Sequence, residues 1–328
     1  MKVGMWSDFS DLFDYEKSRD QCFYRWFVLK QRFKNEGIEF ETFSSKQELD
    51  KFDIIIELDY QGFNHNNKYL IMNESPVVCP ENWDSNIHSY YKKIFCWDDG
   101  LLDDKKYFKH SIGHLIPNSI PKNFEGKKLC CTIAGNKRPK ISHPDELYSH
   151  RINIIRWFER HHPNEFDLYG TNWDQFRFGH STLGRILNKS TFLRKTNQYP
   201  SYRGKVESKF ETMKNYKFSI CYENVKDTNG YISEKIFDSF IAGCVPVYWG
   251  SKTVTNYIPK RCFIDRRDFD NFEEIFKFMK TMSKSEYFDY LENIEDFLNS
   301  EKADVFRAET FASTIVETIV GDLIITNN

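Results

Sequence analysis

Short apolar runs alternate with longer segments of helical periodicity along the first third of the chain. The first apolar run covers residues 3–6. Apolar side chains then recur at three- and four-residue spacing from Cys22 to Phe33, and Gly37 follows, which is typical of an amphipathic helix and its end. Further strands are predicted at residues 38–43, 53–58, 68–73 and 93–97. Strands separated by helices need crossover connections, so the pattern predicts a mostly parallel, doubly wound α/β sheet.

A second unit of the same kind is predicted from about Lys127 onwards. Residues 174–205 show little periodicity and are expected to form a long loop or insertion. The predicted division is into residues 1–125 and 126–328, two doubly wound domains that face a cleft. Ligands of such sheets bind beyond the carboxyl ends of the strands, where helix N-termini favour anions. The expected strands of this unit lie at 129–134, 167–170, 218–222 and 245–249, and its helices at 146–160, 207–216, 233–242, 271–282, 285–299 and 303–319.

Composition narrows the classes of function. With 40% hydrophobic and 29% charged residues the chain is typical of a globular protein, and 17% aromatic residues suit a large core and also a sugar-binding face. A net charge of -2 gives no reason to expect binding to nucleic acid. Neither a membrane span of about 18 apolar residues nor a signal peptide is found, so a soluble, cytoplasmic protein is expected. The sequence also lacks CxxC, GxGxxG and Walker motifs, which argues against a structural zinc site, an ordinary dinucleotide site and a P-loop.

The most informative stretch begins with a strand that ends in a polar Glu-Asn pair, of which Asn224 is the second residue. After a short loop comes Tyr231, and Ser233 is then predicted to cap a helix that has Glu234 and Lys235 in its first turn. Asn224, Tyr231 and Glu234 could bond the hydroxyls of a nucleotide sugar, while Lys235 and the helix N-terminus would meet its phosphates. Taken alone, such residues could simply cap a surface helix.

The stretch as a whole resembles the donor-binding signature of the α-1,3-fucosyltransferases, glycosyltransferase family 10. The pattern Tyr-x-Phe-x-x-x-x-Glu-Asn begins at Tyr216, Tyr-Ile-Ser-Glu-Lys at Tyr231, and Ala-Gly-x-Val-Pro-Val at Ala242, and the family's glycine stands at Gly250. All these elements occur in order and with nearly the family's spacing. The resemblance is strongest over residues 205–280 and traceable over 68–160.

The resemblance implies a GT-B fold with two Rossmann-like domains, an acceptor-binding domain at 1–125 and a GDP-sugar donor-binding domain with terminal helices at 126–328. It also implies an inverting glycosyltransferase that moves L-fucose from GDP-fucose to a hydroxyl of a glycan acceptor. No cofactor is expected beyond the donor substrate GDP-fucose, and a metal ion is not predicted. The absence of the membrane anchor of animal members points to a soluble bacterial or viral form.

The resemblance also assigns roles to individual residues. Asn224, Tyr231, Glu234 and Lys235 match motif positions that contact the donor. Arg151 matches the family's phosphate-binding arginine at the start of a helix, and its forked guanidinium suits phosphate oxygens.

Inversion in one displacement needs a base on the acceptor side of the cleft. Glu74 is the candidate, because it matches a carboxylate at the end of an N-terminal strand and Pro76 breaks that strand just past it. Glu81 is the alternative. The neighbouring pair Asp98 and Asp99 is read as loop acids and not as a metal site.

Two other functions stay open at the level of sequence. The loop at 226–229 differs from that of many family members, so a related transferase that uses another nucleotide sugar is one alternative. A glycan-binding protein that kept the fold and lost catalysis is the other, and the presence of Glu74, Arg151 and the Glu234-Lys235 pair argues against it.

Overall fold

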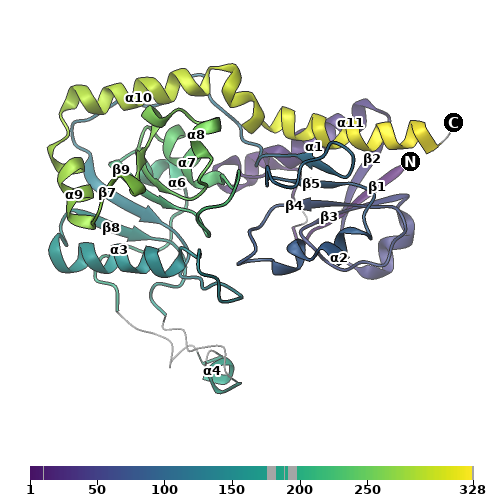
Figure 1. Ribbon diagram of the computed structural model, residues 1–328, viewed down its shortest axis with the longest axis horizontal. Helices are drawn as coiled ribbons and strands as arrows, with labels where there is room; N and C mark the ends of the chain where they lie inside the picture. The colour runs from purple at the N-terminus through teal and green to yellow at the C-terminus, as the bar shows by residue number, and fades with distance from the viewer. Residues whose placement is uncertain (10, 176–181, 188, 191–197, 327–328) are drawn as a thin grey trace.

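Two parallel β-sheets, one from each half of the chain, organise the protein (Figure 1). The computed structural model describes residues 1–9, 11–175, 182–187, 189–190 and 198–326. The first sheet has the strand order β2-β1-β3-β4-β5-β6 and the second has the order β11-β10-β9-β7-β8. In each sheet the order reverses beside the first strand of that half, between β1 and β3 and between β7 and β9. A doubly wound sheet binds ligands at such a switch point.

The first half contains one long helix and six strands. Helix α1 buries Trp26, Leu29 and Phe33 at helical spacing and ends before Gly37, whose φ of 69° is the left-handed conformation common after a helix. Strands β3 and β4 are buried along nearly their whole length, as expected for central strands of a covered parallel sheet. The bounds are β1 Lys2–Trp6, α1 Tyr24–Asn35, β2 Glu39–Phe43, β3 Ile54–Leu58, β4 Lys68–Met72, α2 Ser85–His88, β5 Ile94–Cys96 and β6 Tyr107–Lys109.

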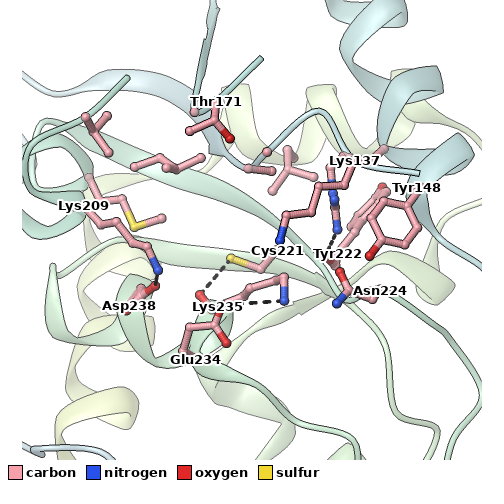
Figure 2. Close-up of a pocket in the computed structure, with 18 of the residues that line it drawn as sticks. Lys137, Tyr148, Thr171, Lys209, Cys221, Tyr222, Asn224, Glu234, Lys235 and Asp238 are labelled. Carbon is pink, nitrogen blue, oxygen red and sulfur yellow. Dashed lines mark hydrogen bonds and ion pairs between the residues drawn. The ribbon is translucent and has the colours of Figure 1, made fainter. Parts of the chain in front are cut away.

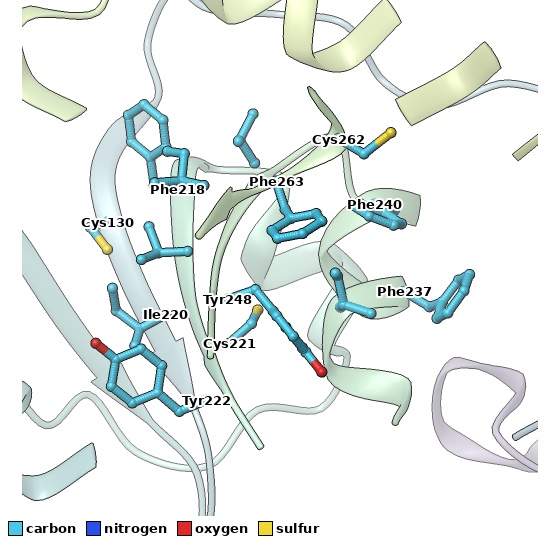
Figure 3. Packing of buried hydrophobic residues seen from close by; sticks show 14 of the residues in the cluster. Cys130, Phe218, Ile220, Cys221, Tyr222, Phe237, Phe240, Tyr248, Cys262 and Phe263 are labelled. Carbon is cyan, nitrogen blue, oxygen red and sulfur yellow. The ribbon is translucent and has the colours of Figure 1, made fainter. Parts of the chain in front are cut away.

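The second half packs its largest core around β9 and β10. Phe218 and Tyr248 on these strands belong to the same buried cluster as Phe237 and Phe240 of α7 (Figure 3). The bounds are β7 Lys128–Ile133, α3 Tyr148–His161, β8 Phe166–Tyr169, α4 Thr182–Leu187, α6 Lys209–Met213, β9 Tyr216–Tyr222, α7 Glu234–Ile241, β10 Val245–Trp249, α8 Val254–Tyr257, β11 Ile264–Asp265, α9 Phe272–Thr281, α10 Lys284–Leu298 and α11 Ala308–Thr326.

The last helix returns to the first half of the molecule. Phe311, Ile315 and Ile319 of α11 belong to the core that α1 and the first sheet share, and Figure 1 shows α11 lying beside α1. The prediction grouped this helix with residues 126–328. The predicted division itself falls in the connection between β6 and β7, and it stays a prediction.

The predicted helix at 303–319 is wrong at its beginning. A short 3-10 helix at Glu301–Phe306 precedes α11, and Arg307 between them is extended. The reason is a backbone contact with the connection between β6 and β7, where the chain passes from the first half to the second. The His114 N–H donates to the Phe306 carbonyl at 2.8 Å, and the Ala308 N–H donates to the His114 carbonyl at 3.1 Å. These bonds compete with the bonds that a continuous helix would make. Strands β6 and β11 were not predicted, since each is only two or three residues long.

No helix within the described ranges combines the length and the apolar character that crossing a membrane requires.

Candidate functional site

A cavity of about 370 Å³ lies between the carboxyl ends of the two sheets. Its walls come from the turn after β4, the loop after β7, the start of α3, the end of β9 and the first turn of α7. All the residues named from the sequence as catalytic or donor-binding line this one cavity: Glu74, Arg151, Asn224, Tyr231, Glu234 and Lys235.

Arg151 joins the start of α3 to the end of β9. Its Nη2 donates to the carbonyl oxygens of Tyr222 at 2.8 Å and Glu223 at 3.1 Å, and its guanidinium lies over the ring of Tyr148. The side chain is buried, and burial lowers the pKa of the guanidinium from its ordinary value. Arg151 therefore fixes the strand end and still lines the cavity.

Lys235 is held in place by a buried carboxylate. Its Nζ lies 3.1 Å from Glu223 Oε2 and 2.9 Å from Ser233 Oγ. Glu223, which is 0% exposed, also accepts from the N–H of Ser233 at 2.8 Å and from its hydroxyl at 2.6 Å. Burial alone would lower the pKa of Lys235, but Glu223 and Glu234 outweigh it and raise that pKa. The ammonium group is therefore fixed in both position and charge.

Lys137 brings a third cation to the same cavity. It follows β7 in the loop before α3, and both Lys137 and Lys235 extend into the cavity (Figure 2). Within the described part of the chain the Lys137 ammonium has no hydrogen-bond or ion-pair partner. With Arg151, these side chains place three cations on the second-sheet wall, beside the acidic Glu234 and Asp238. Such a wall suits a phosphate or diphosphate group.

Asn224 and Tyr231 form a joint between the two halves. Asn224 Nδ2 donates to the Tyr231 hydroxyl at 3.3 Å, and the Tyr231 ring lies 4.8 Å from the ring of Trp97 in the first half. Gly230 makes the approach close, because a Cβ there would stand 2.4 Å from the Trp97 carbonyl oxygen. The loop before α7 is thus braced against the first sheet.

Glu234 lines both this cavity and a second cavity that adjoins it near the start of α1. Burial alone would raise the pKa of Glu234, but Lys235 and Lys209 outweigh it and lower that pKa. The carboxylate stays ionised and can accept hydrogen bonds from sugar hydroxyls. Lys209 itself is paired with Asp238 at 2.6 Å (Figure 2).

Glu74 faces the cations from the first sheet. It follows β4, and its carboxylate has no hydrogen-bond or ion-pair partner within the described residues. Burial and the nearby charge of Asp59 raise its pKa, while Lys235 and Lys137 counteract them. The alternative base, Glu81, is exposed in the 3-10 helix Pro80–Trp83 and does not line the cavity.

No group of three or more His, Cys, Asp or Glu side chains that could hold a metal ion occurs in the described part of the chain. Asp99 of the acidic pair instead contacts Lys109 at 2.6 Å and accepts from the Tyr257 hydroxyl.

The residues that sequence reasoning missed are those that hold the named ones. Glu223 was read only as part of a polar pair, although its burial makes it the support of Lys235. Asp59 directly follows a predicted strand, so its place at the same sheet edge as Glu74 could have been found. Lys137 and Arg138 are adjacent basic residues after the predicted strand at 129–134, and either could face the donor cleft; the structure places Lys137 in the cavity lining and Arg138 outside it.

Comparison with known proteins decides the family. The sequence model for the C-terminal part of glycosyltransferase family 10 (fucosyltransferase) matches residues 150–313, half of the chain. The chain belongs to glycosyltransferase family 10. The family and the enzyme class predicted from the motif string, a glycosyltransferase, are thereby confirmed.

A curated relative from family 10 matches the chain over a short segment. The alpha-(1,3)-fucosyltransferase FucT of Helicobacter pylori is 36% identical over 88 residues, which are 26% of this chain and 18% of that protein. The chain thus matches less than a fifth of this relative's length.

Solved structures match over nearly the whole chain. An α1,3-fucosyltransferase with GDP-fucose gives a TM-score of 0.52 at 17% identity and covers 97% of this chain and 90% of that chain. Alr3699/HepE of Anabaena with UDP-glucose gives 0.55 at 11% identity, over 98% of this chain and 100% of that chain. At these identities the likeness concerns the fold. The fold is GT-B, as predicted.

Proposed function

We propose that this family 10 member transfers L-fucose from GDP-fucose to a hydroxyl of a glycan acceptor, with inversion at the anomeric carbon. One arrangement carries the proposal. Lys137, Arg151 and Lys235 line one wall of the cavity. The Glu74 carboxylate, which has no hydrogen-bond or ion-pair partner among the described residues, reaches it from the opposite sheet. A single displacement needs these two functions, stabilisation of the leaving diphosphate and acceptance of a proton, on opposite sides of the sugar.

The second-sheet half would bind the donor. Arg151 and Lys235 would contact the diphosphate, with Lys137 as a further cation, and the charge that develops on the leaving group would meet cations already in place. Asn224, Tyr231 and Glu234 would bond hydroxyls of the donor. The resulting orientation exposes the anomeric carbon toward Glu74.

Glu74 would act as the general base. Its carboxylate takes the proton of the acceptor hydroxyl while that oxygen forms a bond to the anomeric carbon. The bond from this carbon to the β-phosphate oxygen breaks, and its electron pair leaves with GDP. The transition state has oxocarbenium character, as in other glycosyl chemistry. The raised pKa of Glu74 makes it a better base than an exposed carboxylate.

The first-sheet half would bind the acceptor. A second cavity of about 350 Å³ adjoins the first and shares Asn73 and Glu234 with it. Phe23, Tyr24 and Trp26 at the start of α1 line this cavity, and aromatic faces suit sugar rings. An acceptor there would approach from the Glu74 side of the cleft.

The decisive experiment compares nucleotides and then turnover. GDP without added metal should raise the melting temperature, because a ligand at 100 times its Kd adds about 2.7 kcal/mol of stability. Turnover with GDP-fucose and a panel of N-acetyllactosamine-type acceptors should then give a fucosylated product. Stabilisation by UDP and not by GDP would reject the donor assignment and favour a UDP-sugar transferase, a donor class seen in the Anabaena structure of the same fold. Binding of glycan without transfer or hydrolysis would favour a non-catalytic glycan-binding protein.

A further inference from the structure

The turn that carries Glu74 is tied to a carboxylate on the neighbouring strand. Asp59 directly follows β3, and its N–H donates to the Ile71 carbonyl of β4 at 2.9 Å. Its Oδ1 accepts from the backbone N–H of Asn73 at 2.9 Å and from that of Glu74 at 2.8 Å. Because β3 and β4 are parallel neighbours, their carboxyl ends lie at one sheet edge, and a side chain after β3 can reach the backbone after β4.

A buried amide completes this arrangement. Asn82 is 0% exposed, and its Nδ2 donates to the same Oδ1 of Asp59 at 2.6 Å. The Oδ1 of Asn82 accepts from the Tyr60 N–H at 2.8 Å. Asp59 has a φ of 55°, a left-handed conformation that Asp and Asn adopt more readily than most residues. Backbone and side-chain partners together therefore fix the Asp59 carboxylate.

The two carboxylates near the cavity differ in what they already hold. Asp59 accepts three hydrogen bonds, whereas Glu74 has none in the described chain. A hydrogen bond to the charged form favours that form. Protonating Asp59 would weaken three bonds, and protonating Glu74 weakens none. Burial nevertheless raises the pKa of Asp59, because it outweighs these hydrogen bonds and the charge of Arg25. The difference between the two carboxylates is therefore one of position: Asp59 is tied to the turn, and the Glu74 oxygens are left free for a substrate.

We propose that Asp59 is the positioning residue for Glu74: it holds the turn that aims Glu74 into the cleft, and its negative charge beside Glu74 favours the protonated form of that carboxyl group. This inference rests on the proposed role of Glu74 as base. Asp59 contacts no substrate in it and acts only through Glu74.

Charged and titratable groups from several elements face Glu74. They are Asp59 after β3, Glu234 and Lys235 of α7, Lys137 after β7, Arg25 of α1, Tyr148 of α3 and Tyr231 before α7. After burial, Asp59 makes the largest contribution that raises the pKa of Glu74. Removing the Asp59 charge therefore lowers the pKa of Glu74. Lys235 and Lys137 also lower this pKa, but they are present in both the wild type and the variant and do not change the direction of the shift.

Two variants separate the two parts of the role. Asp59→Gly keeps the left-handed backbone and removes the acceptor oxygen, so the turn loses its anchor. A displacement of about 1 Å at a reacting group costs on the order of 100-fold in rate, so kcat should fall by about that factor while KM for GDP-fucose stays the same. Asp59→Asn keeps both the backbone conformation and an acceptor oxygen. It should recover most of kcat, with the acidic limb of the pH profile moved to lower pH.

Asp103, in the loop between β5 and β6, supplies a control. Its Oδ1 accepts three hydrogen bonds as well, all from backbone N–H groups, those of Lys105, Lys106 and Tyr107, but it is exposed and lines neither cavity. Asp103→Gly and Asp103→Asn should leave kcat and the pH profile unchanged. An equal loss of kcat in the Asp59 and the Asp103 variants would mean that the effect is not specific to the turn that carries Glu74, and it would count against the inference.

A titration that needs no turnover tests the inference directly. In the full chain labelled with ¹³C at the glutamate carboxyl, the resonance missing from Glu74→Gln identifies Glu74. Its midpoint should be lower in Asp59→Asn than in the wild type and unchanged in Asp103→Asn. If the titration midpoint of Glu74 is the same in Asp59→Asn as in the wild type, the inference is overturned. This test holds even if Asp59→Gly does not fold. A lowered midpoint in a chain that neither transfers nor hydrolyses GDP-fucose leaves the pairing intact and rejects the proposed function.

Discussion

At the second-sheet edge of the cleft the principal charged side chains are already bonded to the protein, whereas at the first-sheet edge the Glu74 carboxylate has no partner in the described chain. Lys235 is anchored by Glu223 and Ser233, and Arg151 by two carbonyl oxygens of the β9 end. The difference follows from what each edge would do. Cations that stabilise a leaving group act best when fixed beforehand, because no reorganisation is then needed during the reaction.

A base, by contrast, must keep its lone pairs available. At the first-sheet edge the fixed carboxylate is Asp59, which holds the backbone of Asn73 and Glu74 and leaves the Glu74 carboxylate itself free to react. At the second-sheet edge the fixed side chains would themselves bind the donor, whereas at the first-sheet edge the fixed carboxylate of Asp59 would position another residue, Glu74.

The largest expected effect is on turnover at the first-sheet edge. Glu74→Gln keeps the shape of the side chain but cannot accept a proton near neutral pH. Turnover should fall by a factor of about 100 to 10,000 while the Kd for GDP changes little. Steady-state rates and calorimetric GDP titration measure the two quantities. Glu81→Gln is the control, and a loss confined to Glu81→Gln would move the base to that residue.

Lys235→Ala should have the next largest effect, on binding. GDP and GDP-fucose share the phosphates, so both should bind about ten- to a hundredfold more weakly. The substitution also leaves the buried Glu223 without its cation, so the melting temperature should fall as well. Unchanged GDP affinity in the folded variant would remove Lys235 from the donor site. Arg151→Ala should likewise weaken GDP, since it removes a second phosphate contact.

The pH dependence should differ between the edges. The pKa of Glu74 is raised, so the base form is lost as the pH falls through that value, and kcat should then drop about tenfold per pH unit. The pKa of Lys235 is raised, so this side chain stays charged from acidic pH to well above neutral pH. Its contribution to GDP affinity should therefore persist over the acidic range in which kcat drops. Rates and GDP affinities that fall together on acidification would show that the edges do not act separately.

Lys137→Ala should have the smallest effect. Lys137 is exposed and has no partner within the described residues, so its loss removes one screened charge from the donor wall. GDP affinity should fall about fivefold or less, with no change in melting temperature. The weakening should shrink at high salt, which calorimetry at two ionic strengths can measure. A fall in melting temperature as large as that of Lys235→Ala would contradict the distinction between free and anchored cations.

The sequence predicted the framework of the cleft because of how buried parallel strands are built. β3, β4 and β9 read as short apolar runs, and the polar residues after them had to lie at one sheet edge. Asn224, Tyr231, Glu234 and Lys235 came from one motif string, so their common cavity could be expected, whereas Arg151 came from a separate match about 70 residues earlier. Glu223 and Asp59 were missed because their importance lies in partners 10 to 15 positions away along the chain.

Other features depended on contacts that no local pattern records. The break at Arg307 arises where this residue pairs as an isolated bridge with His114, in the connection between β6 and β7. Helix α11 is apolar enough over its length to be predicted as a buried helix, but only the folded molecule shows that it packs on α1 and shares the core of the first sheet.

The return of α11 to the first half has a consequence for the order in which the protein is made. Ribosomes release the N-terminal part of a chain first, and domains generally fold as units as they emerge. The core of the first sheet, however, includes Phe311, Ile315 and Ile319, which are synthesised after every strand of the second sheet. During translation α1 and the strands beneath it must wait with an uncovered apolar face until these residues appear. The half that is made first is therefore expected to be completed last.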